Sequence, residues 1–143
     1  MLMNHNKAVG LEIRKISNLI KRQYEKCEYK CHMTELNGWI VDFLIENMDK
    51  DIFQKDLEEK FSMRRSTASK MIQLMEQKGI VERKDVDYDK RLKKIILTDK
   101  ALKLHAMANK DIESLENRIS YGLTKEELDL FFTVTEKIKN NLK

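Results

Sequence analysis

The chain contains no proline, and only four of its 143 residues are glycine. Proline breaks helices because it lacks a backbone donor, and glycine favours turns and left-handed backbone. A sequence so poor in both residues favours long, uninterrupted helices over a loop-rich or all-β fold. Because 41% of the residues are apolar, we expect one compact domain of ordinary size with a substantial core.

The spacing of apolar residues predicts six helices. Thr34 and Thr98 are expected to act as N-caps, and Thr124-x-x-Glu127 forms a capping box. Gly79 stands where the end of a helix favours a left-handed residue. The predicted helices span about residues 6–28, 35–47, 53–60, 65–78, 99–121 and 125–142.

The helical period is interrupted between residues 80 and 97. Two short strand-like runs, 80–84 and 93–97, flank the polar segment 85–92. They predict a two-stranded hairpin whose loop is too long for a two-residue turn. The order α-α-α-α-β-β-α-α is that of a mainly α protein with a winged helix-turn-helix in its middle. We expect a DNA-binding lobe over 34–98, flanked by helical regions for dimerisation over 1–33 and 99–143.

Positive charge is concentrated in the same central part of the chain. Residues 60–100 contain twelve Lys or Arg and six acids, so their excess of six exceeds the net charge of +4 of the whole chain. A local excess of cations on a nearly neutral background favours a surface for a polyanion. Charge alone is equally consistent with an ordinary solvated surface.

Cations and hydroxyls crowd the start of the helix predicted over 65–78. Guanidinium groups and hydroxyls bind phosphates and guanine edges, and Asp89 can orient Arg91 towards a minor groove. Taken singly, each residue is also explained as a helix cap or a solvated charge. The candidate DNA-binding residues are Arg64, Arg65, Ser66, Thr67, Ser69, Lys70, Arg83, Lys84, Asp89, Lys90, Arg91 and Lys93.

Four segments of the chain resemble the multiple-antibiotic-resistance regulator (MarR) family of transcription factors. They are Leu57-x3-Phe61, Arg65–Lys70, Met75–Arg83 and Asp89-Lys90-Arg91-x5-Leu97-Thr98. The resemblance implies a homodimer that binds a pseudo-palindromic operator, with helix 65–78 in the major groove and the wing, 85–92, in the minor groove. It also implies a response to a small ligand or an oxidant.

Three positions depart from the pattern of that family. Arg64 stands where such proteins often carry a Ser or Asp cap, Val86 where they often have a further Asp in the wing, and Ala101 where Gly is common. The first two departures bear on base preference and wing geometry.

The outer helices are longer than a small DNA-binding domain needs. We expect apolar residues of the last helix to meet the first helix of a second copy, and a monomer with a self-contained bundle is the alternative. A repressor is favoured because blocking a promoter requires only occupancy. The expected dimer contacts join Leu128, Phe131, Phe132 and Ile138 to Ile13, Ile16 and Ile20.

Cys27, Cys31 and His32 form a cluster at the junction of the first two helices. Free structural thiols, a redox switch and a zinc or copper site are three interpretations of it. In the third interpretation, the protein is a metal-responsive regulator. The cluster supplies three ligands, whereas a closed tetrahedral site needs four.

Tyr24, Trp39 and Phe43 are candidates for an effector pocket, because the family places its pocket between the first, second and fifth helices. Aromatic residues at helical spacing are equally explained by core packing.

No motif for catalysis is recognisable, such as a glycine-rich phosphate loop or a nucleophile elbow. We therefore expect neither an enzyme nor a cofactor. The N-terminus has no signal-peptide pattern and no apolar run approaches the roughly 20 residues of a membrane span, so a cytoplasmic protein without membrane contact is expected.

Overall fold

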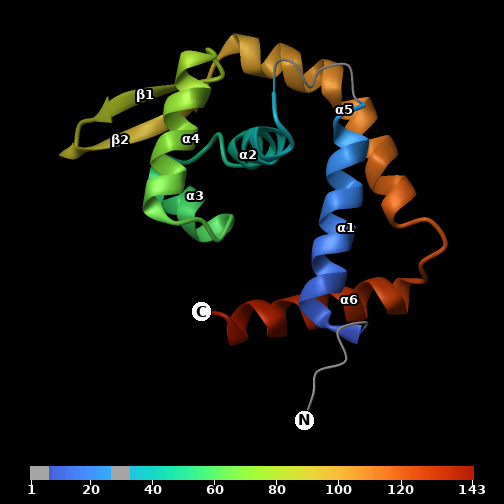
Figure 1. Ribbon diagram of the computed structural model, residues 1–143. Helices are drawn as coiled ribbons and strands as arrows, with labels where there is room; N and C mark the ends of the chain where they lie inside the picture. The colour runs from blue at the N-terminus through green and yellow to red at the C-terminus, as the bar shows by residue number, and fades with distance from the viewer. Residues whose placement is uncertain (1–6, 27–32) are drawn as a thin grey trace. The chain divides into compact units, whose positions relative to one another are not determined.

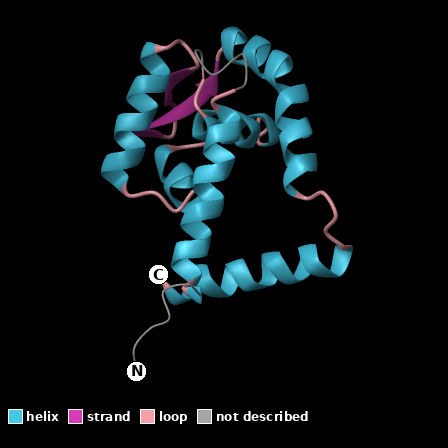
Figure 2. Ribbon diagram, turned by 45° about the vertical axis from the view of Figure 1, so that its right-hand side comes forward, coloured by secondary structure: helices cyan, strands magenta, loops and turns pink. Residues whose placement is uncertain are grey.

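A computed structural model describes residues 7–26 and 33–143 of the protein, and over these ranges it contains six helices and two strands (Figures 1 and 2). The order of elements is the predicted one, and the fold is mainly α. The elements are α1 (Val9–Tyr24), α2 (Glu35–Glu46), α3 (Gln54–Lys60), α4 (Arg65–Gln77), β1 (Val81–Val86), β2 (Asp89–Leu97), α5 (Asp99–Ile119) and α6 (Lys125–Asn141).

The predicted N-caps are confirmed. The Thr34 hydroxyl accepts a hydrogen bond from the Asn37 amide at 3.2 Å, and the Thr98 hydroxyl accepts one from the Ala101 amide at 3.1 Å. Thr124 and Glu127 form the reciprocal capping box. These side chains satisfy backbone donors that the first turn of each helix leaves unpaired, and so they define where α2, α5 and α6 begin.

The chain divides into two compact units, Met1–Asn109 and Lys110–Lys143, and the division falls within α5. In the first unit, α3 contacts α4, α4 contacts β1 and α2 contacts β2 (Figure 1). Side chains from all of these elements and from the loops between them are buried together. The largest of the fully buried side chains are Met33, Ile40, Val41, Leu57, Ile72, Met75, Ile80 and Val81.

A polar contact joins α2 to α5 in the same unit. Asp42 of α2 pairs with the Nε2 atom of His105 on α5, and both side chains are largely covered. The contact of His105 with Asp42 depends on how the two helices pack, which spacing along α5 does not reveal.

The hairpin has a tighter tip than the sequence predicted. The strands pair antiparallel from Val81↔Leu97 to Asp85↔Lys93, and then Val86 pairs with Asp89. The turn therefore has two residues, Asp87 and Tyr88, and the extra residues of β2 form an irregularity in the ladder. The expectation of a long loop over 85–92 was wrong, because a bulge in one strand takes up surplus length that would otherwise enlarge the loop. The residues between the last two pairs are Lys90, Arg91 and Leu92.

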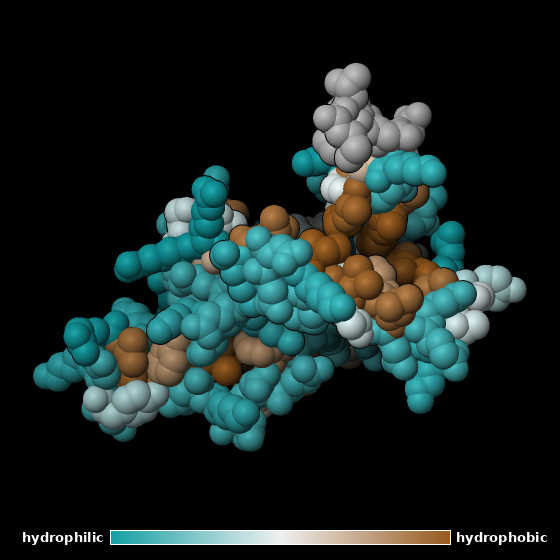
Figure 3. All heavy atoms as spheres, turned by 90° about the horizontal axis from the view of Figure 1, so that it is seen from below, coloured by the Kyte–Doolittle hydropathy of each residue, from teal (hydrophilic) through white to brown (hydrophobic). Residues whose placement is uncertain are grey.

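Helix α6, in the second unit, buries none of its residues. Leu130, Phe131 and Phe132 are 63%, 55% and 61% exposed. Brown hydrophobic side chains gather at the surface when the molecule is seen from below (Figure 3). Such a concentration of exposed large apolar residues is unusual for a monomeric protein.

Helix α1, in the first unit, also carries exposed apolar residues. Val9, Ile13, Ile16 and Leu19 are between 49% and 62% exposed, and Tyr24 is the one residue of this helix that is buried. No helix in the described part of the chain combines the length and the apolar character that crossing a membrane requires.

Candidate nucleic-acid interface

Helix α4 has one buried face and one exposed polar face. Ala68, Ile72 and Met75 are at most 2% exposed and fix the helix on the lobe. Met71 is half-buried. The exposed face carries the residues that the sequence singled out, namely Arg64, Arg65, Ser66, Thr67, Ser69 and Lys70.

A tight turn sets the angle between α3 and α4. Ser62 adopts a φ of +51°, a left-handed conformation that glycine usually supplies. The Met63 amide donates to the Glu58 carbonyl at 2.9 Å and closes the end of α3. This pattern terminates α3 immediately before α4 begins at Arg65, as in a helix-turn-helix.

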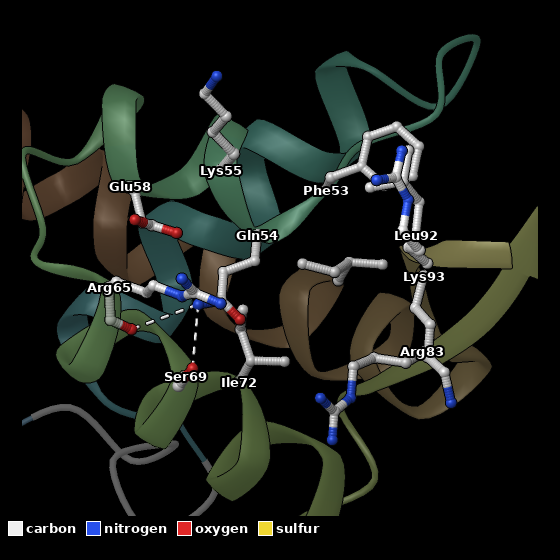
Figure 4. A pocket seen from close by; sticks show the side chains of 12 residues that line it. Phe53, Gln54, Lys55, Glu58, Arg65, Ser69, Ile72, Arg83, Leu92 and Lys93 are labelled. Atoms are coloured by element: carbon white, nitrogen blue, oxygen red, sulfur yellow. Dashed lines mark hydrogen bonds between the residues drawn. The ribbon is translucent and has the colours of Figure 1, made fainter. Parts of the chain in front are cut away.

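Gln54, at the start of α3, connects the two helices. Its amide nitrogen donates to the Arg65 carbonyl at 3.3 Å and to the Ser69 hydroxyl at 3.0 Å (Figure 4). The sequence analysis missed this residue, and the only signal was its position as a polar residue at the start of a short helix. These bonds hold the N-terminal half of α4 against α3.

The end of α4 is tied to the start of α5. The Ile80 and Gly79 amides donate to the Met75 and Glu76 carbonyls at 2.9 and 3.0 Å, and Gly79 has a φ of +74°, as predicted for a helix end. Lys100 of α5 donates to the Lys78 carbonyl at 2.6 Å. A lysine at this position complements the negative end of the helix dipole.

The hairpin contains the predicted pair of Asp89 and Arg91. The Arg91 guanidinium donates to both carboxylate oxygens at 3.2 and 3.1 Å, and the Arg91 amide donates to one of them at 2.9 Å. These bonds lower the pKa of Asp89 below its ordinary value. The Arg91 side chain remains 89% exposed, so its outer surface is free to meet a ligand.

Arg83 makes a contact that the sequence did not predict. Its guanidinium donates to the Glu76 carboxylate of α4 at 3.0 and 3.4 Å, which lowers the pKa of Glu76. Arg83 thus links β1 to α4 and is already partly neutralised. Lys84 has only a distant contact with Glu82, at 4.0 Å, while Lys90 and Lys93 are exposed.

A groove of about 550 Å³ lies between the start of α3, helix α4 and the hairpin. Arg65 and Ser69 approach it from α4, and Arg83 and Lys93 approach it from the strands (Figure 4). Its lining contains five cations and one acid. Arg83 and Arg91 also pair with Glu76 and Asp89, and an excess of positive charge remains. The charged residues of the lining are Lys55, Arg65, Arg83, Arg91, Lys93 and Glu58.

The residues proposed for an effector pocket occupy different environments. Tyr24 is 8% exposed, and Trp39 and Phe43 are half-buried. The Phe43 ring packs edge-on against Phe61 at a centroid distance of 6.0 Å, with the Lys60 ammonium 5.9 Å from its centroid. Packing therefore accounts for Phe43 without a ligand.

The proposed redox or metal cluster of Cys27, Cys31 and His32 lies outside the described residues. Within residues 7–26 and 33–143, no group of three or more His, Cys, Asp or Glu side chains is arranged to hold a metal ion.

Comparisons with known proteins agree with this architecture. A family model described as the MarR family matches residues 38–92, which include α3, α4 and most of the hairpin. A crystal structure of the transcription regulator MarR from Oenococcus oeni is 30% identical, with a TM-score of 0.72 over 92% of this chain and 96% of that one.

Two more distant structures share the fold. The Staphylococcus aureus MepR–DNA complex is 19% identical, with a TM-score of 0.86 over 98% of this chain and 100% of that one. The PcaV transcriptional regulator from Streptomyces coelicolor, solved with its natural ligand, is 15% identical, with a TM-score of 0.81 over 100% of this chain and 99% of that one.

Proposed function

The chain belongs to the MarR family of transcription regulators, and from this premise we propose that it is a sequence-specific, dimeric DNA-binding repressor. Helix α4 enters the major groove of an operator and the wing enters the adjacent minor groove. The observation that carries this proposal is the groove between α4 and the hairpin, which is lined by five basic side chains and one acidic side chain.

The exposed face of α4 suits the major groove. Its first two turns carry Arg65, Ser66, Ser69 and Lys70, and the buried face keeps the helix from rotating. Arginine can pair with guanine in two hydrogen bonds, while hydroxyls and lysine bind phosphates. The contact of Gln54 with Ser69 supports the proposal, because it orients this face before DNA arrives.

The wing contributes Arg91. Its pairing with Asp89 restricts the directions in which the guanidinium can point, and its high exposure leaves it available to DNA. A narrow, A·T-rich minor groove concentrates negative potential and attracts arginine. Lys84, Lys90 and Lys93 contact phosphates in this proposal.

The exposed apolar residues of α1 and α6 support a homodimer. Helix α6 buries none of its own residues, and a second copy provides the cover that this face needs. Regions 1–33 and 99–143 form the dimer in this proposal, and the two-fold axis places two copies of α4 one DNA turn apart, about 34–36 Å.

The proposal also includes regulation by a small ligand or an oxidant, because PcaV was solved with its natural ligand. It includes a cytoplasmic location and no catalytic activity, since MarR-family proteins are transcription regulators.

A mobility-shift titration of the operator tests DNA binding. We expect a protected two-fold site in the upstream region of its own gene and an affinity that falls steeply with salt, by about 0.9 logarithmic units per tenfold salt for each phosphate contact. A shuffled duplex of the same length and composition is the control. Equal affinity for operator and shuffled DNA would contradict sequence-specific binding.

Sedimentation of the free protein tests the dimer. We expect twice the chain mass, and Phe132→Glu should shift it towards the monomer, because a charge would then lie in an apolar interface. Met48→Glu, at a residue that is 66% exposed in the first unit, is the control for an added surface charge. A wild-type monomer at high protein concentration would contradict the dimer.

A further inference from the structure

Asp51, in the loop between α2 and α3, accepts two hydrogen bonds from the hairpin. The Tyr88 hydroxyl donates to one carboxylate oxygen at 3.0 Å, and the Lys94 ammonium lies 3.5 Å from the other. Tyr88 belongs to the turn at the tip of the hairpin, and Lys94 belongs to the middle of β2. The Asp51 carboxylate therefore connects both the tip and the middle of the hairpin to the loop between α2 and α3.

A backbone contact beside Asp51 holds the base of the wing. The Ile95 amide donates to the Ile52 carbonyl at 2.7 Å, and both side chains are buried, at 6% and 7% exposure. This bond joins β2 directly to the loop. In the outer part of the hairpin, the ladder beyond Asp85 is irregular and one side chain, that of Val86, is buried.

The contact of Asp51 with Tyr88 reaches this outer part. The pKa of Tyr88 is raised, first by partial loss of hydration and then by the hydrogen bond to Asp51 and the negative charges of Asp51 and Asp89. The phenol therefore keeps its proton over the whole physiological range and remains a donor. Because Tyr88 is 65% exposed, this contact contributes little to the stability of the fold.

We propose that Asp51 is a positioning residue of the wing: its carboxylate holds Tyr88 and Lys94, and so fixes the angle at which Arg91 meets DNA. This inference rests on the proposed DNA-binding function. Asp51 acts together with Asp89, since Asp89 orients the Arg91 guanidinium within the wing and Asp51 orients the wing on the lobe.

The direction in which operator affinity changes distinguishes a positioning role of Asp51 from a simple effect of its negative charge. A carboxylate beside a cationic surface repels DNA, so removing it should strengthen binding if the residue is only a surface charge. If Asp51 positions the wing, its removal should weaken binding although the protein becomes more positive.

The experiment compares Asp51→Ala with Asp49→Ala in the full chain. Asp49 is exposed in the same loop, and it has no side-chain hydrogen bond or ion pair to any residue that the structure describes, so it is a matched control for the lost charge. We expect Asp51→Ala to bind the operator about 5- to 10-fold more weakly than wild type, which is within the net range of one ordinary hydrogen bond at an exposed site. Asp49→Ala should bind as tightly as wild type or more tightly.

Tyr88→Phe provides a second variant that changes no charge. It should weaken operator binding in the same direction, and the double variant with Asp51→Ala should bind no more weakly than Asp51→Ala alone. Tyr121→Phe is its control, because Tyr121 is 89% exposed and lies in the second unit. Fully additive losses would contradict a shared mechanism.

A measurement on the free protein checks the contact itself. In an ultraviolet titration of tyrosine, the signal that disappears in Tyr88→Phe should move to lower pH in Asp51→Ala and stay unchanged in Asp49→Ala. If Asp51→Ala leaves that signal in place, the contact does not form in solution and the inference is wrong.

The remaining outcomes are also decisive. If the signal moves but Asp51→Ala binds operator as tightly as Asp49→Ala, the positioning role is refuted while the proposed function stands. If wild type does not prefer operator to shuffled DNA, the proposed function fails and the inference fails with it, although the titration still reports the contact.

Discussion

Gly79→Ala tests the turn that connects α4 to the wing. Gly79 has a φ of +74°, and a left-handed backbone costs an L-residue about 1–2 kcal/mol. A Cβ built on Gly79 would lie 3.6 Å from Cδ of Lys100, an ordinary contact, so no clash adds to this cost. Alanine also restricts the unfolded chain, which returns about 0.4–1 kcal/mol. The net loss of unfolding free energy is about 1 kcal/mol, or about 2–4 °C in Tm for a chain of this size.

Urea unfolding at one fixed protein concentration measures this loss, with a thermal scan beside it. Gly122→Ala is the matched control, because Gly122 has a φ of +79° and its added Cβ would meet nothing within 4 Å. The two variants should therefore lose similar amounts. Gly10→Ala, in the first turn of α1, should instead raise the free energy of unfolding by at most about 0.5–1 kcal/mol, since alanine is the better helix residue.

Two results would refute the reasoning on Gly79. An unchanged stability of Gly79→Ala would mean that the turn does not impose a left-handed backbone in solution. A loss above about 3 kcal/mol would mean that the Cβ meets a closer obstacle than Lys100, since backbone strain alone does not reach that value. Operator affinity should stay near that of wild type, because Gly79 contributes no side chain to DNA.

Four further predictions concern α3, α4 and the hairpin. Arg65→Ala should weaken operator binding by about 1–3 kcal/mol and reduce the preference for operator over shuffled DNA, and a uniform loss on all sequences would contradict base contacts by Arg65. Arg91→Ala should chiefly weaken binding to operators with A·T-rich flanks. Competition mobility shifts measure both effects. Glu76→Gln should lower the urea midpoint at neutral pH, because the hydrogen bond and charge of Arg83 lower the pKa of Glu76 below 4.5. This stabilisation is present above pH 4.5 and is lost as the pH falls through the lowered pKa, so the two midpoints should converge in acid, and a difference that stays constant with pH would refute the pairing. Leu57→Ala should lower the free energy of unfolding, measured with urea, by about 2–5 kcal/mol, because the Leu57 side chain is 0% exposed. A loss below about 1 kcal/mol would mean that the surrounding side chains fill the space that the deletion leaves.

Features that depend on near neighbours along the chain could be predicted from the sequence. The order of elements, the caps at Thr34, Thr98 and Thr124 and the left-handed turn at Gly79 all follow from period and from residue preferences within one helical turn. The pair of Asp89 and Arg91 belongs to the same class, because two residues of separation restrict the geometry strongly. The hairpin was predicted, but its turn was not, since a bulge and a longer loop contain equal numbers of residues.

The contacts between distant residues were decided by the tertiary structure. Glu76 could pair with any of the 28 Lys and Arg residues as far as composition is concerned, and the packing of α4 on β1 selects Arg83. Asp51 and Tyr88 are 37 positions apart and meet because the tip of the hairpin lies against the loop between α2 and α3. Local residue preferences determine which backbone conformation a segment adopts. The partner of a polar side chain depends instead on the angles at which helices and strands pack through their buried faces. Those angles are set by the packing of all the elements of the lobe together.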